Sequence, residues 1–370
     1  MTTTTAAVVR DAGGSFELTE VALAPLRPDE VVVRMVATGV CHTDISAARG
    51  VIPFPLPGVL GHEGGGVVED VGAQVRRVVV GDKVLMTFTS CGRCDKCRSG
   101  HPAYCDHHLR LNLLGGRRAD GSATLSVDGQ DLSGHFFGQS SFSCRALADE
   151  RSLVRLPPDT RDEELRVLAP LGCGFMTGAG AVLNELRPAP GSVLVVTGAG
   201  AVGLAALMAS RMTPVSRVIV VDRVPSRLTL ASELGAADVI DTSRVDMHQA
   251  ILDGTAGRGA DLAVETTGST AVLEGLMESL AVAGQCVVVG APPAGSRASF
   301  DVNTWLPGRA VRGVTMGDSE PEAFIPLLVE AYRAGRFPID RLERTYAFAN
   351  IDRAVSDASA GVTIKPVLTF

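Results

Sequence analysis

Residues 192–210 read SVLVVTGAGAVGLAALMAS, and this stretch decides the fold of the middle of the chain. Its first part, 193–196, is an apolar run of the kind found in strands buried on both faces of a parallel sheet. Gly198, Gly200 and Gly203 then give the pattern G-x-G-x-x-G, followed by an Ala- and Leu-rich segment that predicts a helix. Glycines in this setting are typical of a loop that holds a dinucleotide pyrophosphate.

A second apolar run, 218–221, ends at Asp222 and extends this interpretation. An acidic residue about 20 positions after the glycines accepts hydrogen bonds from ribose hydroxyls and repels a 2′-phosphate, which favours NAD over NADP. Arg223 follows directly and weakens that preference, because an arginine there can bind a phosphate. Arg227 is expected to cap the adenosine end.

Strand and helix patterns alternate after this point, which predicts a doubly wound parallel sheet. The expected strands are 238–240, 261–265 and 285–290, and the expected helices lie near 225–235, 246–253 and 270–282. Before Pro188 the sequence differs, with short β-rich runs such as 30–36 and 66–72 between Gly and Pro turns, as in a small barrel. The predicted fold class is therefore α/β, with a β-barrel domain and a doubly wound domain.

Length, charge and composition limit the function classes. A chain of 370 residues is too long for one ordinary core, so two domains are expected. The net charge of −7 and the lack of a basic run argue against a nucleic-acid partner. The start of the chain does not read as a signal peptide, and no apolar stretch has membrane-spanning length. We therefore expect a cytoplasmic protein without a membrane partner.

Four of the eight cysteines fall within fifteen residues, in the spacing C-x2-C-x2-C-x7-C. Four thiolates around one ion form a closed tetrahedral site, so Cys91, Cys94, Cys97 and Cys105 predict structural zinc. Unconnected surface thiols at this density would oxidise readily. A DNA-binding zinc finger is disfavoured because no basic helix lies nearby.

Several motifs together resemble the zinc-dependent alcohol dehydrogenases of the medium-chain dehydrogenase/reductase superfamily. They are Gly-His-Glu at 61–63, the four-cysteine lobe, CGFMTG at 173–178, the glycine pattern, and IKPVL at 364–368. Within that family, SGHFFGQSSF at 133–142, GDS at 317–319 and GRFP at 335–338 resemble the bacterial aryl-alcohol (benzyl alcohol) dehydrogenase branch.

The resemblance implies how the domains are arranged along the chain. Residues 1–174 would form a GroES-like β-barrel catalytic domain whose structural zinc lobe lies at about 91–105. Residues 175–315 would form the inserted NAD-binding Rossmann domain, and 316–370 would return to the catalytic domain. A homodimer joined by edge strands near 309–317 is expected, with a tetramer as the alternative.

The resemblance also implies a second, catalytic zinc bound by Cys41, His62 and Cys173, which gives two zinc ions per subunit. Alcohol dehydrogenase is the standard example of this Cys2His ligand set, so the assignment comes from the resemblance and not from spacing. Thr43 would exchange the proton of the substrate hydroxyl and Asp44 would orient His62. Glu63 would lie behind the zinc and ligate it transiently.

The remaining implied sites bind NAD and the substrate. The cofactor residues, beyond the glycines, Asp222 and the two arginines above, are His42, Thr177, Ala201, Val202, Thr267, Val289, Gly290, Ala291 and Lys365. The apolar substrate pocket would use Ile52, Phe54, Phe88, Phe136, Phe137, Trp305 and Leu306. Trp305 and Leu306 would come from the neighbouring subunit. The alternative for the aromatic pair Phe136 and Phe137 is an ordinary core position under a loop. Cys144 and Cys286 are assigned to packing.

The resulting hypothesis is reversible oxidation of a primary aryl, allylic or terpenoid alcohol to the aldehyde, with hydride transfer to NAD. One alternative is a biosynthetic NAD(P)H-dependent reductase of an aldehyde, iminium or enal, and another is a non-catalytic zinc- and dinucleotide-binding sensor. One residue departs from the family pattern. Ser46 stands where well-studied animal members carry a histidine, and a serine cannot act as a base near neutral pH. The terminal base of the proton relay is therefore left unassigned.

Overall fold

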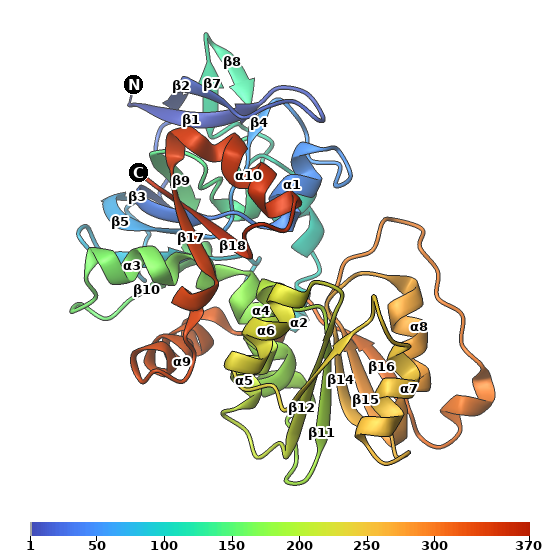
Figure 1. The fold of residues 1–370 in the computed structure, drawn as a ribbon. Helices are drawn as coiled ribbons and strands as arrows, with labels where there is room; N and C mark the ends of the chain where they lie inside the picture. Colours follow the sequence, from blue (N-terminus) through green and yellow to red (C-terminus); the bar gives the residue numbers. More distant parts are fainter. Residues whose placement is uncertain (1) are drawn as a thin grey trace. The chain divides into compact units, whose positions relative to one another are not determined.

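The computed structural model describes residues 2–370 as two compact units (Figure 1). The first unit contains the chain up to Cys173 together with Glu320–Val329 and Ile339–Phe370, and the second contains Gly174–Ser319 and Glu330–Pro338. The sequence placed the divisions at 174/175 and 315/316. Each unit is described by itself.

Two sheets build the first unit. The five-stranded sheet has the order β4-β1-β2-β7-β8, and the larger sheet has the order β10-β6-β5-β3-β18-β17 with β9 also paired to β3. The strands of the first sheet are β1 (Thr3–Val9), β2 (Glu17–Leu23), β4 (Gly58–Val59), β7 (Leu125–Val127) and β8 (Gln130–Leu132). Those of the second are β3 (Glu30–Gly39), β5 (Gly64–Val71), β6 (Lys83–Met86), β9 (Arg145–Asp149), β10 (Leu153–Arg155), β17 (Glu343–Ala347) and β18 (Lys365–Thr369).

Strand β3 is the centre of the larger sheet, because it pairs antiparallel with β5, β9 and β18. Val31, Val33 and Met35 occupy alternate positions of β3 and pack into one buried cluster with residues of β5, β6 and β9. This alternation is the period of a strand with one face turned to a core. The helices of this unit are α1 (His42–Ala48), α2 (Asp95–Arg98), α3 (Asp162–Leu168), α10 (Ile351–Ser359) and the part of α9 (Pro321–Arg333) before residue 330.

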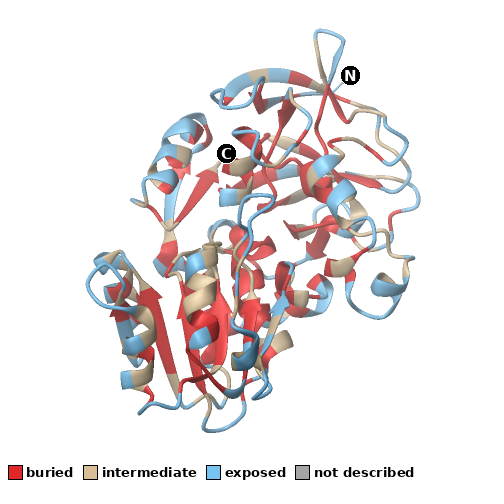
Figure 2. Ribbon diagram, turned by 90° about the vertical axis from the view of Figure 1, so that its right-hand side faces the viewer, coloured by how far each residue is buried: buried red, intermediate tan, exposed pale blue. Residues whose placement is uncertain are grey.

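The second unit holds a six-stranded sheet in the order β13-β12-β11-β14-β15-β16, and all of its pairs are parallel. Its strands are β11 (Val193–Thr197), β12 (Arg217–Asp222), β13 (Asp238–Asp241), β14 (Ala260–Glu265), β15 (Leu280–Val288) and β16 (Ala310–Gly313). Its helices are α4 (Gly174–Gly180), α5 (Ala201–Ser210), α6 (Pro225–Glu233), α7 (Met247–Gly254) and α8 (Thr270–Glu278). Figure 2 shows that the strands are largely buried, and exposed positions lie on α6, α7 and α8, whereas α4 and α5 are mostly buried. The predicted doubly wound parallel sheet is confirmed.

Helix α8 differs from its prediction because it ends at Glu278 and not near residue 282. The chain turns at Ser279, and β15 already begins at Leu280, where it pairs with Ala260 of β14.

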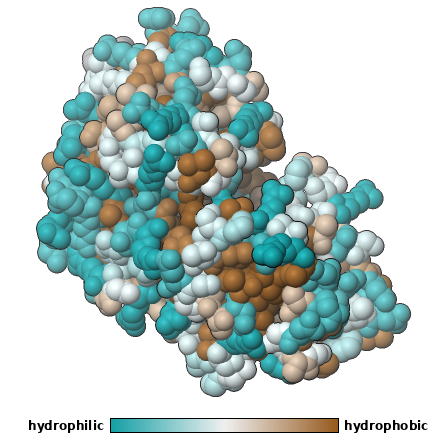
Figure 3. Space-filling model, viewed as in Figure 1, coloured by the Kyte–Doolittle hydropathy of each residue, from teal (hydrophilic) through white to brown (hydrophobic). Residues whose placement is uncertain are grey.

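Figure 3 shows apolar surface on this unit over the region where Figure 1 labels β12 and β14. Within residues 2–370 no single helix is long and apolar enough to cross a membrane, although the bent pair 162–172 and 174–186 passes by length and composition alone.

Candidate active site and metal centres

Asp44 joins two of the predicted zinc ligands. It lies in the first turn of α1, directly after β3, and is fully buried. Its Oδ1 accepts hydrogen bonds from Nδ1 of His62 at 2.8 Å and from the backbone N–H of Gly61 at 3.0 Å. Its Oδ2 accepts from the backbone N–H of Cys41 at 2.9 Å. One carboxylate therefore fixes the ring of His62 and the backbone of Cys41, as predicted for a residue that orients a histidine ligand.

A buried group of possible ligand atoms surrounds the other nitrogen of His62. The ligand atoms of Cys41, His62, Glu63 and Cys173 all lie within 4.8 Å of one another. Because Nδ1 bonds to Asp44, Nε2 is the atom left to coordinate, and it is buried without a hydrogen-bond partner among residues 2–370. A buried polar nitrogen without a partner is costly, so it marks the position of a missing group. Two thiols and an imidazole are the donors that zinc prefers, and the residues therefore fit the ion.

The electrostatics of this cluster favour a thiolate. The Cys173 thiol is the main influence that holds the pKa of Cys41 well below its ordinary value, with further contributions from His62 and Lys365. Burial disfavours the imidazolium form of His62, but the charge and hydrogen bond of Asp44, together with Cys41, raise the pKa of His62 to about 10. The hydrogen bond with Cys41, together with burial, raises the pKa of the Cys173 thiol well above its ordinary value, so Cys173 and His62 must release protons when a metal binds. Cys41 is the ligand already favoured as the thiolate that binds a metal.

Glu63 is held by a buried lysine. The Nζ atom of Lys365 lies 2.9 Å from Oε1 and 2.8 Å from Oε2 of Glu63, and both side chains are at most 3% exposed. Burial opposes the charge, but the carboxylate of Glu63 and the nearby cysteines raise the pKa of Lys365 above its ordinary value. A Cβ at Gly39 would lie 2.0 Å from Oε2 of Glu63, so only glycine leaves room for this carboxylate. Lys365, predicted as a cofactor residue, therefore forms a buried ion pair with Glu63.

The four-cysteine lobe has the geometry of a second metal centre. The sulfur atoms of Cys91, Cys94, Cys97 and Cys105 lie within 4.8 Å of one another, and Cys94 and Cys97 approach to 3.5 Å. A tetrahedral zinc site with Zn–S bonds of about 2.3 Å has S···S separations near 3.8 Å. Burial opposes ionisation, but backbone N–H groups of Arg93 and Cys94 lower the pKa of Cys91 to about 6. The lobe therefore fits zinc.

Three of the predicted pocket aromatics gather around His62. The ring of Phe137 stacks on His62 with a centroid distance of 4.4 Å and an interplanar angle of 23°. Phe136 packs edge-on against His62 at 5.5 Å and against Phe137 at 5.0 Å, and Phe54 packs on Phe136 at 5.1 Å. All three phenylalanines are buried. They form an apolar wall beside the possible ligand cluster.

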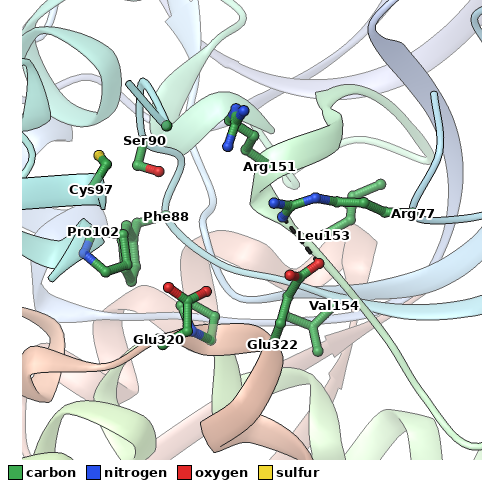
Figure 4. Close-up of a pocket in the computed structure, with 12 residues that line it drawn as sticks. Arg77, Phe88, Ser90, Cys97, Pro102, Arg151, Leu153, Val154, Glu320 and Glu322 are labelled. Atoms are coloured by element: carbon green, nitrogen blue, oxygen red, sulfur yellow. Dashed lines mark ion pairs between the residues drawn. The ribbon is translucent and has the colours of Figure 1, made fainter. Parts of the chain in front are cut away.

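The other residues predicted to line the substrate pocket are described by their own surroundings, and their role there stays a prediction. Phe88 lines a cavity of about 130 Å³ beside the four-cysteine lobe, together with Cys97 and several charged side chains (Figure 4). In that cavity Arg77 pairs with Glu322 at 3.0 Å. Trp305 packs on the core of the second unit, and Leu306 is 78% exposed on the same unit. Ile52 is half-buried in the loop after α1.

The glycine loop of the second unit is built for close approach. Gly198 has φ +91°, and a Cβ at Gly203 would lie 1.8 Å from the carbonyl oxygen of Gly198, so both positions require glycine. A Cβ at Gly200 would meet nothing within 4 Å, which leaves open space at the start of α5, where Ala201 and Val202 form the first turn. That space fits a pyrophosphate at a helix N-terminus.

The predicted ribose and adenosine residues lie at the end of β12. Asp222 accepts hydrogen bonds from the backbone N–H of Ala199 at 2.6 Å and of Arg223 at 2.7 Å, so its carboxylate also shapes the glycine loop. The side chain of Arg223 is exposed. The Nε atom of Arg227 is buried and finds no hydrogen-bond partner within the described part of the chain. That nitrogen is available to a bound ligand.

The remaining predicted cofactor residues are placed in both units. Val289 and Gly290 donate backbone hydrogen bonds to the carbonyl oxygen of Glu265, which brings them beside Thr267; Ala291 approaches Gly268 in the same turn region. These residues therefore gather after β14 and β15. Thr177 is buried in α4, 4.0 Å from the sulfur of Met316. His42 is exposed at the start of α1 in the first unit.

Two residues beside the ligand cluster were missed by the sequence reasoning. Gln139 and Thr87 are fully buried and hydrogen-bond to the segments that carry His62 and Cys173. Neither residue belongs to a pattern with metal-binding spacing, and both come from segments remote from the ligands in sequence. Gln139 lies in the stretch SGHFFGQSSF that carries the resemblance, but nothing in the sequence indicates the hydrogen bonds of either residue.

Comparisons with known proteins agree with this geometry. Residues 27–158 match the alcohol dehydrogenase GroES-like domain family and residues 201–330 match the zinc-binding dehydrogenase family. The chain is 40% identical over 366 residues to the geraniol dehydrogenase of Castellaniella defragrans, a match that covers 99% of this chain and 97% of the relative.

Two solved structures have the same fold over nearly their full lengths. An alcohol dehydrogenase zinc-binding domain protein from Burkholderia ambifaria has a TM-score of 0.96 and 47% identity, covering 100% of this chain and 99% of the other. Benzyl alcohol dehydrogenase from Acinetobacter calcoaceticus has a TM-score of 0.95 and 42% identity, with both chains fully covered. The predicted family and fold class are confirmed. The chain belongs to the zinc-dependent medium-chain alcohol dehydrogenases, oxidoreductases with a GroES-like domain and a Rossmann-like nucleotide-binding domain.

Proposed function

We propose that this chain oxidises primary aryl, allylic or terpenoid alcohols to aldehydes, with NAD as the hydride acceptor. The observation that carries the proposal is the set of buried rings of Phe54, Phe136 and Phe137 packed beside His62. Burial of an aromatic ring against such a wall supplies a favourable free energy of roughly 25 cal/mol per Å². The relatives named for geraniol and benzyl alcohol support the choice, because both substrates are primary alcohols with a π system next to the carbinol carbon.

The residues of the cluster have distinct roles in this reaction. Zinc held by Cys41, His62 and Cys173 supplies Lewis acidity toward the alcohol oxygen. Thr43, whose hydroxyl lies 3.7 Å from the sulfur of Cys41, exchanges the proton of the substrate hydroxyl. Asp44 keeps His62 in the tautomer whose Nε2 is free to coordinate. The terminal base of the relay stays unassigned, because Ser46 cannot fill that role near neutral pH.

The cofactor content and assembly are part of the proposal. The two cysteine-containing clusters support two zinc ions per subunit, one catalytic and one structural. The carboxylate of Asp222 at the end of β12 supports NAD over NADP. A homodimer joined through the edge strand β16, and a cytoplasmic location, stay predictions from the sequence. The alternative of a biosynthetic reductase is not favoured, because the named relatives are alcohol dehydrogenases.

A substrate panel tests the proposal. Purified protein is assayed with benzyl, cinnamyl, geranyl and short aliphatic alcohols, each with NAD and with NADP, by the absorbance of the reduced cofactor. We expect kcat/KM with NAD to be highest for the first three alcohols, and activity to disappear when a chelator removes zinc. A preference for ethanol, or turnover that persists in metal-free protein, contradicts the proposal.

A matched pair of variants tests the aromatic wall. Phe136→Leu removes one ring contact beside His62 and should lower kcat/KM for benzyl alcohol about fivefold more than for ethanol, because an aromatic pair contributes about 1 kcal/mol. Phe348→Leu changes another buried ring of the same unit, which packs on Phe370. It should affect both substrates equally. An equal effect of Phe136→Leu on both alcohols would remove the wall from the substrate site.

A further inference from the structure

Gln139 is a buried amide whose two N–H donors and carbonyl oxygen all bond to backbone groups near the ligand cluster. Its Nε2 donates to the carbonyl oxygen of His62 at 3.0 Å and to that of Thr87 at 2.8 Å. Its Oε1 accepts from the backbone N–H of Gly64 at 3.3 Å. The side chain is 1% exposed, so no water replaces these bonds if the amide is removed. Gln139 therefore ties both sides of the His62–Gly64 segment to the end of β6.

Thr87 continues this connection to the third predicted ligand. Its hydroxyl donates to the carbonyl oxygen of Gly172 at 2.6 Å, and Gly172 directly precedes Cys173. A Cβ at Gly172 would lie 1.9 Å from the carbonyl oxygen of Met86, so the two segments are in direct contact. Hydrogen bonds therefore run from the backbone of His62 through Gln139 and Thr87 to the residue before Cys173.

The loop that carries Gln139 is held in an unusual conformation. Phe137, Gly138 and Ser140 have φ values of +53°, +67° and +50°, in the left-handed region that non-glycine residues rarely adopt. Such strain persists only where surrounding contacts impose it, and it gathers at functional sites. Here the same loop places the ring of Phe137 on the imidazole of His62 and the amide of Gln139 on the backbone of His62.

Asp44 cannot replace this connection. Its three hydrogen bonds end at Cys41, Gly61 and His62, so they fix Cys41 relative to His62 and leave Cys173 to other contacts. Buried backbone groups that lose a partner cost about 1–3 kcal/mol each, so the segments of His62 and Cys173 would shift when Gln139 or Thr87 is changed. Residues that hold metal ligands in place typically change metal affinity or activity by about 10–100-fold when they are replaced.

We propose that Gln139 and Thr87 are positioning residues that set the separation of His62 from Cys173 and thereby the affinity of the catalytic site for its metal. This inference rests on the proposed catalytic zinc site. The role differs from that of a general packing residue, because its effect falls on one metal site of the two. Neither side chain titrates or offers itself as a zinc ligand, so the effect is geometric.

The test uses full-length protein with the variants Thr87→Val, Thr87→Ser and Gln139→Met. Zinc release to a colorimetric chelator and the visible spectrum of the Co²⁺-substituted protein are measured, and the catalytic site is identified by its absence in Cys41→Ser. We expect Thr87→Val and Gln139→Met to weaken retention of the catalytic metal about 10–100-fold and to alter its cobalt bands. Thr87→Ser keeps the hydroxyl and should restore parental values.

The matched control is Asn112→Leu. Asn112 is an equally buried amide that bonds twice to the backbone of Thr89 and once to the carbonyl oxygen of His108, and these bonds do not involve the backbone of His62 or of Gly172. It should lower the melting temperature without changing the catalytic cobalt bands. Parental metal retention and spectrum in Thr87→Val overturn the inference even if Gln139→Met does not fold, and so does an equal loss in Asn112→Leu. A parent protein whose cobalt spectrum equals that of Cys41→Ser overturns the proposed zinc site together with the inference.

Discussion

The two cysteine-containing clusters offer the same kind of atoms to a metal but are built in opposite ways. The four-cysteine lobe takes all its sulfur atoms from residues 91–105, and three of its four cysteines are partly exposed. The other cluster takes Cys41, His62 and Cys173 from separate segments of the chain, and His62 and Cys173 are buried. The first cluster is made by local spacing, whereas the second is made by the sheets and loops of the whole first unit.

This difference shows which interactions hold the side chains of each cluster in place. A lobe with so little core of its own depends on the metal for its folding free energy. The buried cluster is held by hydrogen bonds of Asp44, Gln139 and Thr87, which do not require a metal. We therefore expect loss of the metal to cost stability at the lobe and activity at the buried cluster.

The largest effect should come from Cys41→Ser. Loss of one ligand removes the several kcal/mol that a Lewis acid contributes to the transition state, so alcohol oxidation should fall about a thousandfold or more. The melting temperature should change little, because the bonds of Asp44 to the backbone and to His62 remain. Turnover and thermal unfolding are measured, with Cys144→Ser as the control that keeps parental activity. A loss of stability as large as that in a lobe variant would break the comparison.

The next effect concerns the buried ion pair that attaches the loop of Arg118 to strand β3. Arg118 forms a buried bidentate pair with Glu30 at the start of β3, at 2.5 and 2.8 Å. Arg118→Met leaves the carboxylate of Glu30 buried without its cation and should lower the free energy of unfolding by about 3–5 kcal/mol. Denaturant unfolding followed by circular dichroism measures it.

The matched control for that measurement is Arg117→Met, whose pair with Asp131 is solvent-exposed. Exposed pairs contribute about 1 kcal/mol or less. Equal effects of the two substitutions would mean that the buried pair of Arg118 and Glu30 stabilises the fold no more than an exposed pair does.

A smaller effect is expected from Cys97→Ser in the four-cysteine lobe. The protein should lose one of two zinc ions per chain and about 2–3 kcal/mol of stability, which lowers the melting temperature by roughly 3–4 °C in a chain of this size. Activity below the melting transition should stay within a few-fold of the parent. Metal analysis and limited proteolysis of residues 91–105 check this result. Complete loss of activity in protein that is still folded would contradict a purely structural role for the lobe.

The smallest effect concerns pH and the packing next to the aromatic wall. Burial, with a further contribution from Arg118, lowers the pKa of His135 to about 4. In the unfolded chain His135 binds a proton as the pH falls below about 6.5, whereas in the folded chain it does so only near pH 4. His135 therefore does not reduce the free energy of unfolding above pH 6.5, and it reduces it increasingly as the pH falls toward 4. At pH 5 the loss is about 2 kcal/mol.

The measurement is the pH dependence of the free energy of unfolding between pH 7.5 and 5. His135→Gln should flatten it, whereas His107→Gln, at an exposed position, should follow the parent. A slope that is unchanged in His135→Gln would show that other groups cause the acid sensitivity.

The sequence predicted the features that depend on local spacing. The glycine pattern and the apolar run before it identified the parallel sheet, because a strand, a tight turn and a helix follow one another within about 20 residues. The spacing of the four cysteines identified the lobe for the same reason. Helix α8 was predicted too long, because its end depends on the pairing of Leu280 with Ala260, which no local pattern reveals.

The buried cluster was predicted only through the family resemblance, and its supporting residues were not predicted. Gln139 lies 77 residues from His62 along the chain, and Thr87 lies 85 residues from Gly172, so their contacts exist only once the fold has formed. The cavity that Phe88 lines beside the lobe and the ion pair of Lys365 with Glu63 are also tertiary contacts that no local pattern reveals. Sequence alone identifies residue types, whereas the partners of a buried side chain are set by tertiary packing.

The three glycines of the nucleotide loop differ in what enforces them. Gly198 and Gly203 are required by the chain itself, so a side chain at either position should be rejected during folding. Gly200 has ordinary backbone angles and empty space beside it, and nothing within the protein forbids an alanine there. A screen of thermal stability without nucleotide would therefore classify Gly200→Ala as tolerated. Only a titration with the cofactor would reveal that the space beside Gly200 is needed for binding.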